Sequence, residues 1–170
     1  MCQYVKYVHS PIGQLTLASD GVSLKGLWIE NQKYYGNQWK SFVEKDLPVF
    51  NKVERWLNDY FQGKNPQIDF QIEPLGTAFQ QKVWKQLLMI PYGKVITYDA
   101  LATIIADESG KKKCAQAIGQ AIGHNPISII IPCHRVVGKN GSLTGYAGGI
   151  DKKVFLLKME GVDLTSFYVP

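Results

Sequence analysis

The hydrophobic positions of the first thirty residues alternate with polar ones, as they do along the strands of a half-buried β-sheet. Two turn-forming sequences, Ser-Pro-Ile-Gly and Asp-Gly, interrupt the alternation. We therefore predict a meander of three antiparallel strands over residues 2–8, 14–19 and 22–30. In the third strand, the pattern places Val22, Leu24 and Trp28 on one face.

A longer spacing, of three or four residues between apolar positions, predicts an amphipathic helix over residues 49–62 that ends at Gly63. Its apolar face contains Val49, Phe50, Val53, Trp56, Leu57, Tyr60 and Phe61. Residues 31–45 are polar and have no period, which indicates a loop with room for helical turns. Alternation over residues 67–72 indicates one more strand. Because residues 1–74 contain no cluster of reactive groups, we expect a small α+β domain with a supporting or docking role.

Beyond a linker at residues 74–76, the pattern becomes helical. Thr77 and Gln80 have the spacing of a capping box, which starts a helix that ends before Pro91. The buried stripe of this helix is expected to consist of Phe79, Val83, Trp84, Leu87 and Leu88. Thr97 is placed to cap the next helix, residues 98–106, and a polar break follows at residues 107–110. This second helix is expected to bury Leu101, Ile104 and Ile105.

A third helix is predicted over residues 111–123, with Ala115, Ile118 and Ile122 inward. It has a basic start, and with the preceding helix it has the dimensions of a helix-turn-helix. Glycine inside a helix is unfavourable by about 1 kcal/mol relative to alanine, yet this helix contains Gly119 and Gly123. Close packing by a neighbouring helix is the commoner reason for such glycines, and close approach to a nucleic-acid backbone is the alternative.

The stretch around which the chain is organised is residues 124–136, H-N-P-I-S-I-I-I-P-C-H-R-V. Its five central residues, 127–131, are apolar or small and lie between two prolines, which predicts a short buried strand. A thiol, an imidazole and a guanidinium follow at once, on Cys133, His134 and Arg135. Reactive groups at the end of a buried strand are typical of a functional site.

A final helix is predicted from Asp151, as its cap, through Glu160, and Gly161 ends it. The helix is expected to turn inward Val154, Phe155 and Leu157. Glu160 lies in the last turn, where a negative charge is electrostatically unfavourable unless another group pairs with it.

Cys133 has two interpretations. A cysteine beside an apolar run most often packs in the core as a small hydrophobic residue. A nucleophilic thiolate is favoured instead by the neighbours, since Pro132 stiffens the backbone while His134 and Arg135 supply positive charge. Adjacent side chains of an extended chain point to opposite faces. His134 could therefore serve Cys133 only through a turn or a bridging water, and it would need an orienting group of its own.

The composition is that of an ordinary globular protein, with 45% of the 170 residues hydrophobic and 19% charged. No apolar run of about 18 residues and no signal peptide is present, so we expect no membrane segment. The cysteines, at positions 2, 114 and 133, lack paired spacing, so we expect no disulfide framework and a reducing cytoplasm. A zinc site built from Cys114, Cys133, His124 and His134 matches no ligand spacing, and we expect no metal.

The positive charge is unevenly distributed. Residues 1–74 have eight basic and eight acidic side chains, whereas residues 75–170 have eleven and six, so the whole net charge of +5 lies in the second part. Its densest cluster is Lys111, Lys112 and Lys113. A basic face is consistent with phosphate binding, although solvated lysines are the commoner reason for such a run.

Several motifs occur together in the second part. They are Phe79-Gln80-x-x-Val83-Trp84, Ile90-Pro91-x-Gly93, Thr97-Tyr98, Asn125-Pro126, Ile131-Pro132-Cys133-His134-Arg135-Val136 and Gly145-Tyr146-Ala147-Gly148-Gly149. In content and order they resemble the O6-alkylguanine-DNA alkyltransferases, also called methylated-DNA–protein-cysteine methyltransferases. The motif around the cysteine is similar to the active-site motif of that family and is highly specific. The resemblance covers essentially all of residues 75–170 and, more loosely, the first part.

This resemblance implies an α+β protein of two domains. Residues 1–74 would form a small ribonuclease-H-like α/β domain, and residues 75–170 a mostly helical, winged-helix-like domain whose helix-turn-helix binds DNA. The implied activity is direct-reversal DNA repair, in which a cysteine takes the alkyl group from O6 of guanine in one irreversible, stoichiometric step. The implied partner is double-stranded DNA containing O6-alkylguanine, met by a monomer without cofactor or metal.

The resemblance also implies roles for individual residues. Cys133 is the nucleophile, His134 draws the thiol proton through a bridging water, and Glu160 orients His134. Asn125 fixes the turn that carries the site, and Tyr98 gives the leaving guanine a proton or a hydrogen bond. The pocket for the flipped base is implied at Val136, Tyr146, Ala147 and Gly148. The implied DNA contacts are Thr97, Lys113, Ala115, Gln116, Gly119 and Arg135.

Two residues depart from the pattern of the family. Gln116 stands where an arginine commonly fills the gap left by the flipped base, and we expect its amide to take that role, with Lys113 as the next candidate. Ala147 stands where a serine often follows the pocket tyrosine, so it keeps the main-chain N–H but lacks a hydroxyl.

Two other classes of function are open at this point. A DNA-binding lesion sensor would use the same helix-turn-helix without chemistry, but relatives that only flag lesions lack the cysteine, so Cys133 argues against it. A cysteine hydrolase would need an oxyanion hole beside the Cys–His pair, and no hydrolase signature surrounds Cys133.

Overall fold

The computed structural model describes residues 3–36, 39 and 41–170, which combine strands and helices as the predicted α+β class requires. The chain divides into two compact units. The first consists of Met1–Leu75 and Pro126–Ser128, and the second of Gly76–Asn125 and Ile129–Pro170. Cys2, expected to open the first strand, and positions 37, 38 and 40 of the expected loop lie outside the described residues. Within the described ranges, no helix is long and apolar enough to cross a bilayer.

The first unit contains a four-stranded sheet of order β3-β2-β1-β4. The predicted antiparallel meander is confirmed by β1 (Gln3–Ser10), β2 (Gly13–Ser19) and β3 (Leu24–Ile29). Val22 lies in the turn between β2 and β3 and is 70% exposed, so its predicted place on a buried face is wrong. β4 (Phe42–Glu44) pairs in parallel with β1, and the sequence pattern does not reveal it because all three of its residues are exposed.

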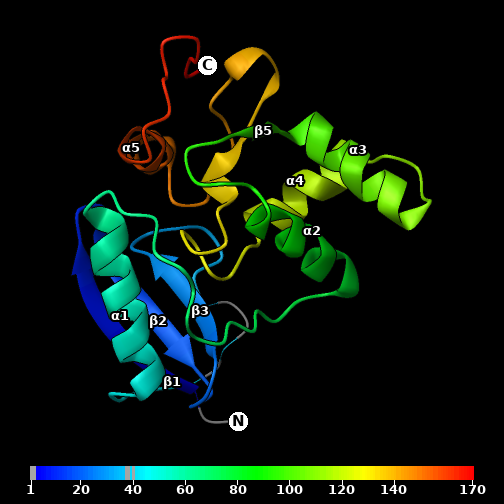
Figure 1. Ribbon diagram of the computed structural model, residues 1–170. Coiled ribbons are helices and arrows are strands. Elements are labelled where there is room, and N and C mark those ends of the chain that lie inside the picture. Colours follow the sequence, from blue (N-terminus) through cyan, green and yellow to red (C-terminus); the bar gives the residue numbers. More distant parts are fainter. Residues whose placement is uncertain (1–2, 37–38, 40) are drawn as a thin grey trace. The chain divides into compact units, whose positions relative to one another are not determined.

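α1 (Pro48–Phe61) confirms the helix predicted in the first unit, and Figure 1 shows it lying across the sheet. Of its seven expected apolar residues, Phe61 alone is only half-buried. Gly63 follows the helix with φ 83°, a conformation that favours glycine. The strand predicted over residues 67–72 is wrong, since only Ile72 forms a bridge, to Leu24.

The outer edge of β3 is covered by two short segments from later in the chain. Residues 71–73 exchange two hydrogen bonds with Leu24, and residues 126–128 exchange two with Leu27, each of the latter 2.9 Å long. Pairing of this kind satisfies the backbone groups of an edge strand. The segment that leads towards Cys133 is therefore anchored in the sheet of the first unit.

The strand predicted over residues 127–131 is correct in burial but wrong in conformation. All five side chains are buried, yet only Ile127 forms a bridge, and the chain then turns with Ile129 at φ 72°. A β-branched residue rarely adopts a positive φ, so the surrounding structure must hold this turn. Part of that support is the Ser128 hydroxyl, which donates a 3.0 Å hydrogen bond to the side chain of Gln32.

The second unit is mostly helical. Its elements are α2 (Ala78–Leu88), β5 (Ile96–Thr97), α3 (Tyr98–Ser109), α4 (Ala115–Gly123), β6 (Val136–Val137) and α5 (Ile150–Met159). β5 and β6 pair in parallel, and α3 and α4 form the predicted helix-turn-helix beside α2 (Figure 1). Trp84 on α2 is buried, and its indole N–H donates to the carbonyl of Ala121 on α4 at 2.9 Å. This bond joins α2 to the second helix of the helix-turn-helix.

Two of the three predicted helix caps of this unit are confirmed. Asp151, expected to cap the last helix, is wrong as a cap, because α5 begins at Ile150 with Gly149 as its N-cap and Asp151 lies in its first turn. The Thr77 hydroxyl accepts from the backbone of Gln80, and the Gln80 side chain accepts from the backbone of Thr77, which completes the capping box. Thr97 caps α3 by accepting from the backbone N–H of Ala100 at 3.1 Å.

Several boundaries and orientations in the second unit differ from the prediction. α3 continues to Ser109, so residues 107–109 are helical, and α4 begins only at Ala115, whose side chain is exposed and not inward. Four residues expected in buried stripes keep 37–41% of their surface exposed, namely Phe79, Leu88, Ile104 and Phe155. Each lies at the margin of a stripe, where a helix that packs on one side only leaves its apolar residues in solvent. On α5, the inward residues are Lys153, Leu156 and Leu157.

Replacing Thr77 by alanine is expected to lower the free energy of unfolding by about 1 kcal/mol, because the hydrogen bond from the Gln80 N–H to the Thr77 hydroxyl is lost. Denaturant titration followed by circular dichroism measures the change. Thr103→Ala is the matched control, since Thr103 lies inside α3, where alanine is the better helix former. An equal loss in both variants would contradict a specific role for the cap.

Candidate active site

Cys133 is the first residue of a short 3₁₀ turn, Cys133–Arg135. The turn follows the buried loop directly and lies in the interior of the second unit. Pro132 precedes the turn, and the Arg135 N–H donates to the Pro132 carbonyl at 3.0 Å. The thiol is buried, with 5% of the residue exposed. The chain at Cys133 and His134 is therefore turned and not extended, so the two side chains need not point to opposite faces.

Asn125 holds the loop that leads to this turn. Its side-chain amide donates to the carbonyl of Ile131 at 2.8 Å, and the residue is buried. The bond closes residues 125–131 into a fixed loop that ends two residues before the thiol. Burial raises the pKa of the Cys133 thiol, and a hydrogen bond with the side chain of Asn125 opposes part of that rise.

His134 and Glu160 form a fully buried pair. Nε2 of His134 lies 2.5 Å from Oε2 of Glu160, and neither side chain is exposed. Oε1 of Glu160 accepts from Nε of Arg135 at 2.8 Å and from the backbone N–H of Gly93 at 3.1 Å. These partners explain the acidic residue at the C-terminal end of α5. The sequence pattern does not indicate that Arg135 and Gly93 are partners of Glu160.

Arg135 is directed into the protein and not towards a surface. Besides Glu160, its guanidinium donates to the carbonyl of Ile90 at 2.7 Å, and 11% of its side chain is exposed. Its charge is therefore paired with a buried carboxylate. This arrangement does not favour the expected contact of Arg135 with DNA.

Burial dominates the acid–base state of the thiol and the imidazole. It raises the pKa of Cys133, and it lowers the pKa of His134 although the hydrogen bond from Glu160 acts in the opposite direction. At neutral pH both groups are consequently uncharged. The expected positive charge on His134 is therefore absent at rest, and the positive charge of Arg135 is paired with Glu160. The cation whose charge lowers the pKa of Cys133 is Lys153 on α5.

The sequence reasoning overlooks Lys153, although a signal was available. Lys153 lies three and four residues before Leu156 and Leu157, so it occupies the apolar face of its helix. A lysine on a buried helical face is rare and usually has a specific partner. Its ammonium donates to the carbonyl of Val136 at 2.5 Å and to that of Thr144 at 2.9 Å.

Of the residues expected to form a base pocket, Val136 and Tyr146 lie beside the turn of Cys133. Val136 is buried and follows the 3₁₀ turn directly, while Ala147 and Gly148 are half-buried. The Tyr146 ring centre lies 6.4 Å from that of His134, at an interplanar angle of 85°. The Tyr146 hydroxyl is buried and has no hydrogen-bond partner among the described residues. It is an available donor for a bound molecule.

Tyr98 lies at the start of α3, and its hydroxyl donates to the carbonyl of Thr144 at 3.1 Å. Burial, together with the neighbouring Cys133, raises the pKa of Tyr98 to about 12. The phenol therefore stays protonated at neutral pH and can act as a donor. Thr97, expected to contact DNA, uses its hydroxyl as the cap of α3.

The residues expected to meet DNA on the helix-turn-helix lie on or just before α4. Ala115 and Gln116 are exposed in its first turn, and Lys113 pairs with Asp99. A side chain at Gly119 or Gly123 would have no atom within 4 Å beyond the helix itself and the neighbouring residues. Packing by a neighbouring helix, the commoner reason for such glycines, therefore does not apply among the described residues. The alternative, an approaching partner molecule, is consistent with this open surface.

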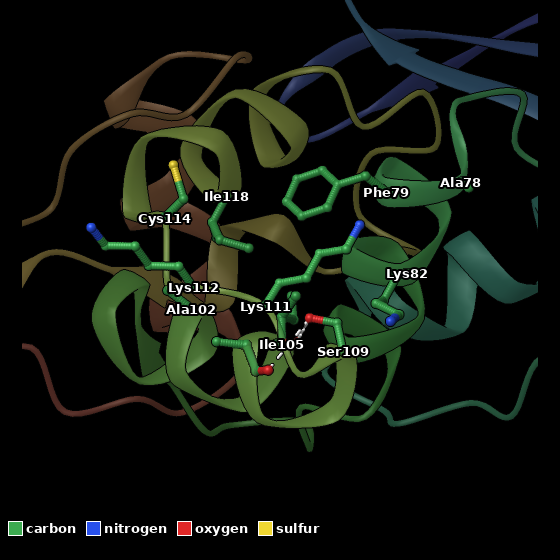
Figure 2. Close-up of a pocket in the computed structure, with 11 residues that line it drawn as sticks. Ala78, Phe79, Lys82, Ala102, Ile105, Ser109, Lys111, Lys112, Cys114 and Ile118 are labelled. Atoms are coloured by element: carbon green, nitrogen blue, oxygen red, sulfur yellow. Dashed lines mark hydrogen bonds between the residues drawn. The ribbon is translucent and has the colours of Figure 1, made fainter.

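A separate cavity of about 230 Å³ lies between α2, α3 and α4 (Figure 2). Apolar side chains such as Phe79, Ile105 and Ile118 line it, with lysines and the exposed Cys114 among its other lining residues. Cys133 does not line this cavity, so it is distinct from the thiol site. Among the described residues, no group of three or more His, Cys, Asp or Glu side chains is arranged to hold a metal ion.

Comparison with known proteins identifies the family. Residues 3–75 match the model of the 6-O-methylguanine DNA methyltransferase ribonuclease-like domain, and residues 78–162 match that of its DNA binding domain. The Mycobacterium tuberculosis (strain H37Rv) methylated-DNA–protein-cysteine methyltransferase is 44% identical over 168 residues, which cover 96% of this chain and 98% of that protein. The Haemophilus influenzae protein of the same name is 42% identical over 94% of this chain and 87% of its own length.

A solved structure agrees with these matches. The crystal structure of Mycobacterium tuberculosis OGT in complex with DNA has a TM-score of 0.82 and 44% sequence identity, and the match covers 93% of each chain. The architecture of both units and the order of the motifs are therefore those of one family. The chain belongs to the methylated-DNA–protein-cysteine methyltransferases, the 6-O-methylguanine DNA methyltransferase family.

Proposed function

We propose that this protein repairs DNA by transferring an alkyl group, typically methyl, from O6 of guanine to Sγ of Cys133. The observation that carries the proposal is the buried arrangement of Cys133, His134 and Glu160, a nucleophile followed by a base and the group that orients it. A DNA-binding lesion sensor has no use for this arrangement. Because the product is a thioether that no group in the site can cleave, each molecule acts once.

The reaction follows from the neutral resting state. The proton of the thiol passes through a bridging water to Nδ1 of His134, because Nε2 is engaged by Glu160. The carboxylate then stabilises the imidazolium. The Sγ–carbon bond forms as the carbon–O6 bond breaks, and the electron pair of that bond goes to the guanine. Tyr98 lets the guanine leave in neutral form by donating a hydrogen bond or a proton.

The base occupies a pocket formed by Val136, Tyr146, Ala147 and Gly148. Main-chain groups of Cys133, Val136 and Ala147 read the edge of the base, and the Tyr146 hydroxyl, which is buried and unpaired within the described residues, gains a partner on binding. O6 of guanine lies inside the duplex, so the nucleotide must be flipped out at a cost of a few kcal/mol.

The surface of α4 is the part of the chain suited to flipping. Its residues Ala115 and Gly119 are small, which permits close approach of a sugar-phosphate backbone in the minor groove. Gln116 lies between them, exposed in the first turn, and its amide bonds to the orphaned partner base. Thr97 and Lys113 flank the contact. The need to keep the thiol reduced until it meets damage supports the reducing cytoplasm as the compartment of the reaction.

Cys133→Ala is expected to abolish alkyl uptake and to leave duplex affinity largely intact, because DNA binding depends on phosphate contacts and on α4. After incubation with O6-methylguanine DNA, intact-protein mass spectrometry should show that the protein with the original sequence has gained the mass of one CH₂ group. Peptide mapping should assign this group to Cys133. Cys114→Ala, which removes an exposed thiol, is the control and should retain full uptake. Uptake by the Cys133 variant, or a methyl group on another cysteine, would refute the assignment.

Glu160→Gln is expected to slow transfer by at least about tenfold while changing DNA affinity little, because His134 becomes a weaker base. The charge of Glu160 raises the pKa of His134, so its removal lowers that pKa further. Below its pKa the imidazole is protonated and cannot accept the thiol proton, so the acid limb of the rate profile should move to lower pH. Glu108→Gln, which removes an exposed carboxylate from α3, is the matched control. An unchanged profile in the Glu160 variant would contradict the orienting role.

Gly119→Ala is expected to stabilise α4 by about 0.5–1 kcal/mol, because the added methyl group meets open space and alanine is the better helix former. The same methyl group should weaken duplex binding and slow repair. Thermal unfolding and transfer from duplex DNA measure the two effects, and transfer from free O6-benzylguanine, which needs no base flipping, should be unchanged. Repair of duplex at the original rate would mean that this surface does not approach DNA closely.

A further inference from the structure

Lys153 is a buried charged group that takes no part in the reaction steps proposed for Cys133, His134, Glu160 and Tyr98. Its residue is 0% exposed, on the inward face of α5. Burying an ammonium ion is unfavourable unless hydrogen bonds or an opposite charge compensate. In the described part of the chain no carboxylate pairs with Lys153, and its hydrogen bonds go to two main-chain carbonyls. A charge kept in such a place calls for a functional reason.

The two carbonyls belong to the walls of the site. That of Val136 follows the turn of Cys133 directly, and that of Thr144 precedes the pocket residue Tyr146 by two positions. Tyr98 donates to the same Thr144 carbonyl, and its ring centre lies 5.8 Å from the ammonium. A single nitrogen therefore connects α5, the segment after the thiol and the segment before the pocket tyrosine.

The charges around the thiol leave Lys153 as the relevant cation. His134 is uncharged at rest, and the guanidinium of Arg135 is paired with Glu160. The phenols of Tyr98 and Tyr146 stay protonated, since burial raises the pKa of both. Burial lowers the pKa of Lys153 to about 8, so most of it is still protonated at neutral pH. The influence is mutual: Lys153 lowers the pKa of Cys133, and a Cys133 thiolate raises that of Lys153.

We propose that the buried ammonium of Lys153 is the fixed counter-charge of the Cys133 thiolate, and that Lys153 is thereby a positioning residue for alkyl transfer. This inference rests on the proposed reaction at Cys133. When the thiol proton moves to His134, negative charge appears on Sγ in a region from which water is excluded, and an ammonium already in place stabilises it without reorganisation. When the Sγ–carbon bond forms, that charge disappears.

The protonation states of His134 and Lys153 limit the rate of transfer at both acid and alkaline pH. Acid protonates His134, which removes the base. Above pH of about 8, Lys153 begins to lose the proton that stabilises the thiolate. Transfer should therefore slow again in alkaline solution, although a solvent-exposed thiol would continue to gain reactivity there.

The test removes the charge while keeping most of the volume. In protein whose Cys2 and Cys114 are replaced by serine, the ultraviolet absorbance of the thiolate follows the ionisation of Cys133 against pH. Lys153→Met should reduce the thiolate fraction near neutral pH by about tenfold and slow transfer to free O6-benzylguanine by a similar factor. Lys158→Met removes the same charge from the exposed face of the same helix and should change neither quantity.

Chemical rescue separates charge from packing if the methionine variant is unstable. Lys153→Ala should regain transfer with propylammonium ions, which restore a cation, and should not regain it with propanol, which fills the same space. Equal rescue by both compounds would overturn the proposed role of Lys153 as counter-charge. So would a Lys153→Met variant in which Cys133 ionises at the same pH as in the protein that keeps Lys153. Failure of the unmodified protein to take up any alkyl group would instead overturn the proposed reaction, which the titration does not depend on.

Discussion

The burial of the Glu160 carboxylate is the constraint on which the second unit depends. A carboxylate without solvent must have its oxygens satisfied, or the fold loses several kcal/mol. Its partners are the imidazole of His134, the guanidinium of Arg135 and the backbone N–H of Gly93. They come from two separate parts of the chain, so satisfying one side chain fixes the end of α5 against the turn of Cys133 and the segment after α2. The proposed catalytic pair and the packing of the unit thus share one interaction.

The buried setting also determines how reactive the thiol is. Desolvation disfavours both the thiolate and the imidazolium, so the resting site is a neutral pair and not an ion pair. A protein that acts once gains from such restraint, because a permanently ionised thiol would be consumed by other electrophiles. Reactivity must then come from charges that are already in place when the proton moves. Glu160 stabilises one product of that transfer, and the ammonium of Lys153 stabilises the other.

In contrast to the buried site, helix α4 has an open surface, and its glycines make the helix less stable than alanines would. Gly119 has room for a side chain and would be the more stable as alanine, yet no described residue packs against it. In the same unit, α2 begins with a full capping box, and its Trp84 anchors α4 through the carbonyl of Ala121. A well-capped helix therefore supports one whose own sequence favours contact over stability. That division is expected where a helix must approach another molecule closely.

Patterns of short range were sufficient for the meander, for α1, for the caps at Thr77 and Thr97 and for the cysteine motif, because each depends on neighbours within a few residues. Long-range contacts decided the rest. The isoleucine run before Cys133 has the composition of a strand, but anchoring of its first residues to β3 and the Asn125 hydrogen bond turn it into a buried loop. Long-range contacts also explain why the role expected of Arg135 beside the thiol is proposed instead for Lys153, a residue for which the sequence pattern gave no expectation. The effect of a charge depends on its burial and on its partners. Arg135 pairs with Glu160, 25 residues later, and Lys153 donates to the carbonyls of Val136 and Thr144, 17 and 9 residues earlier.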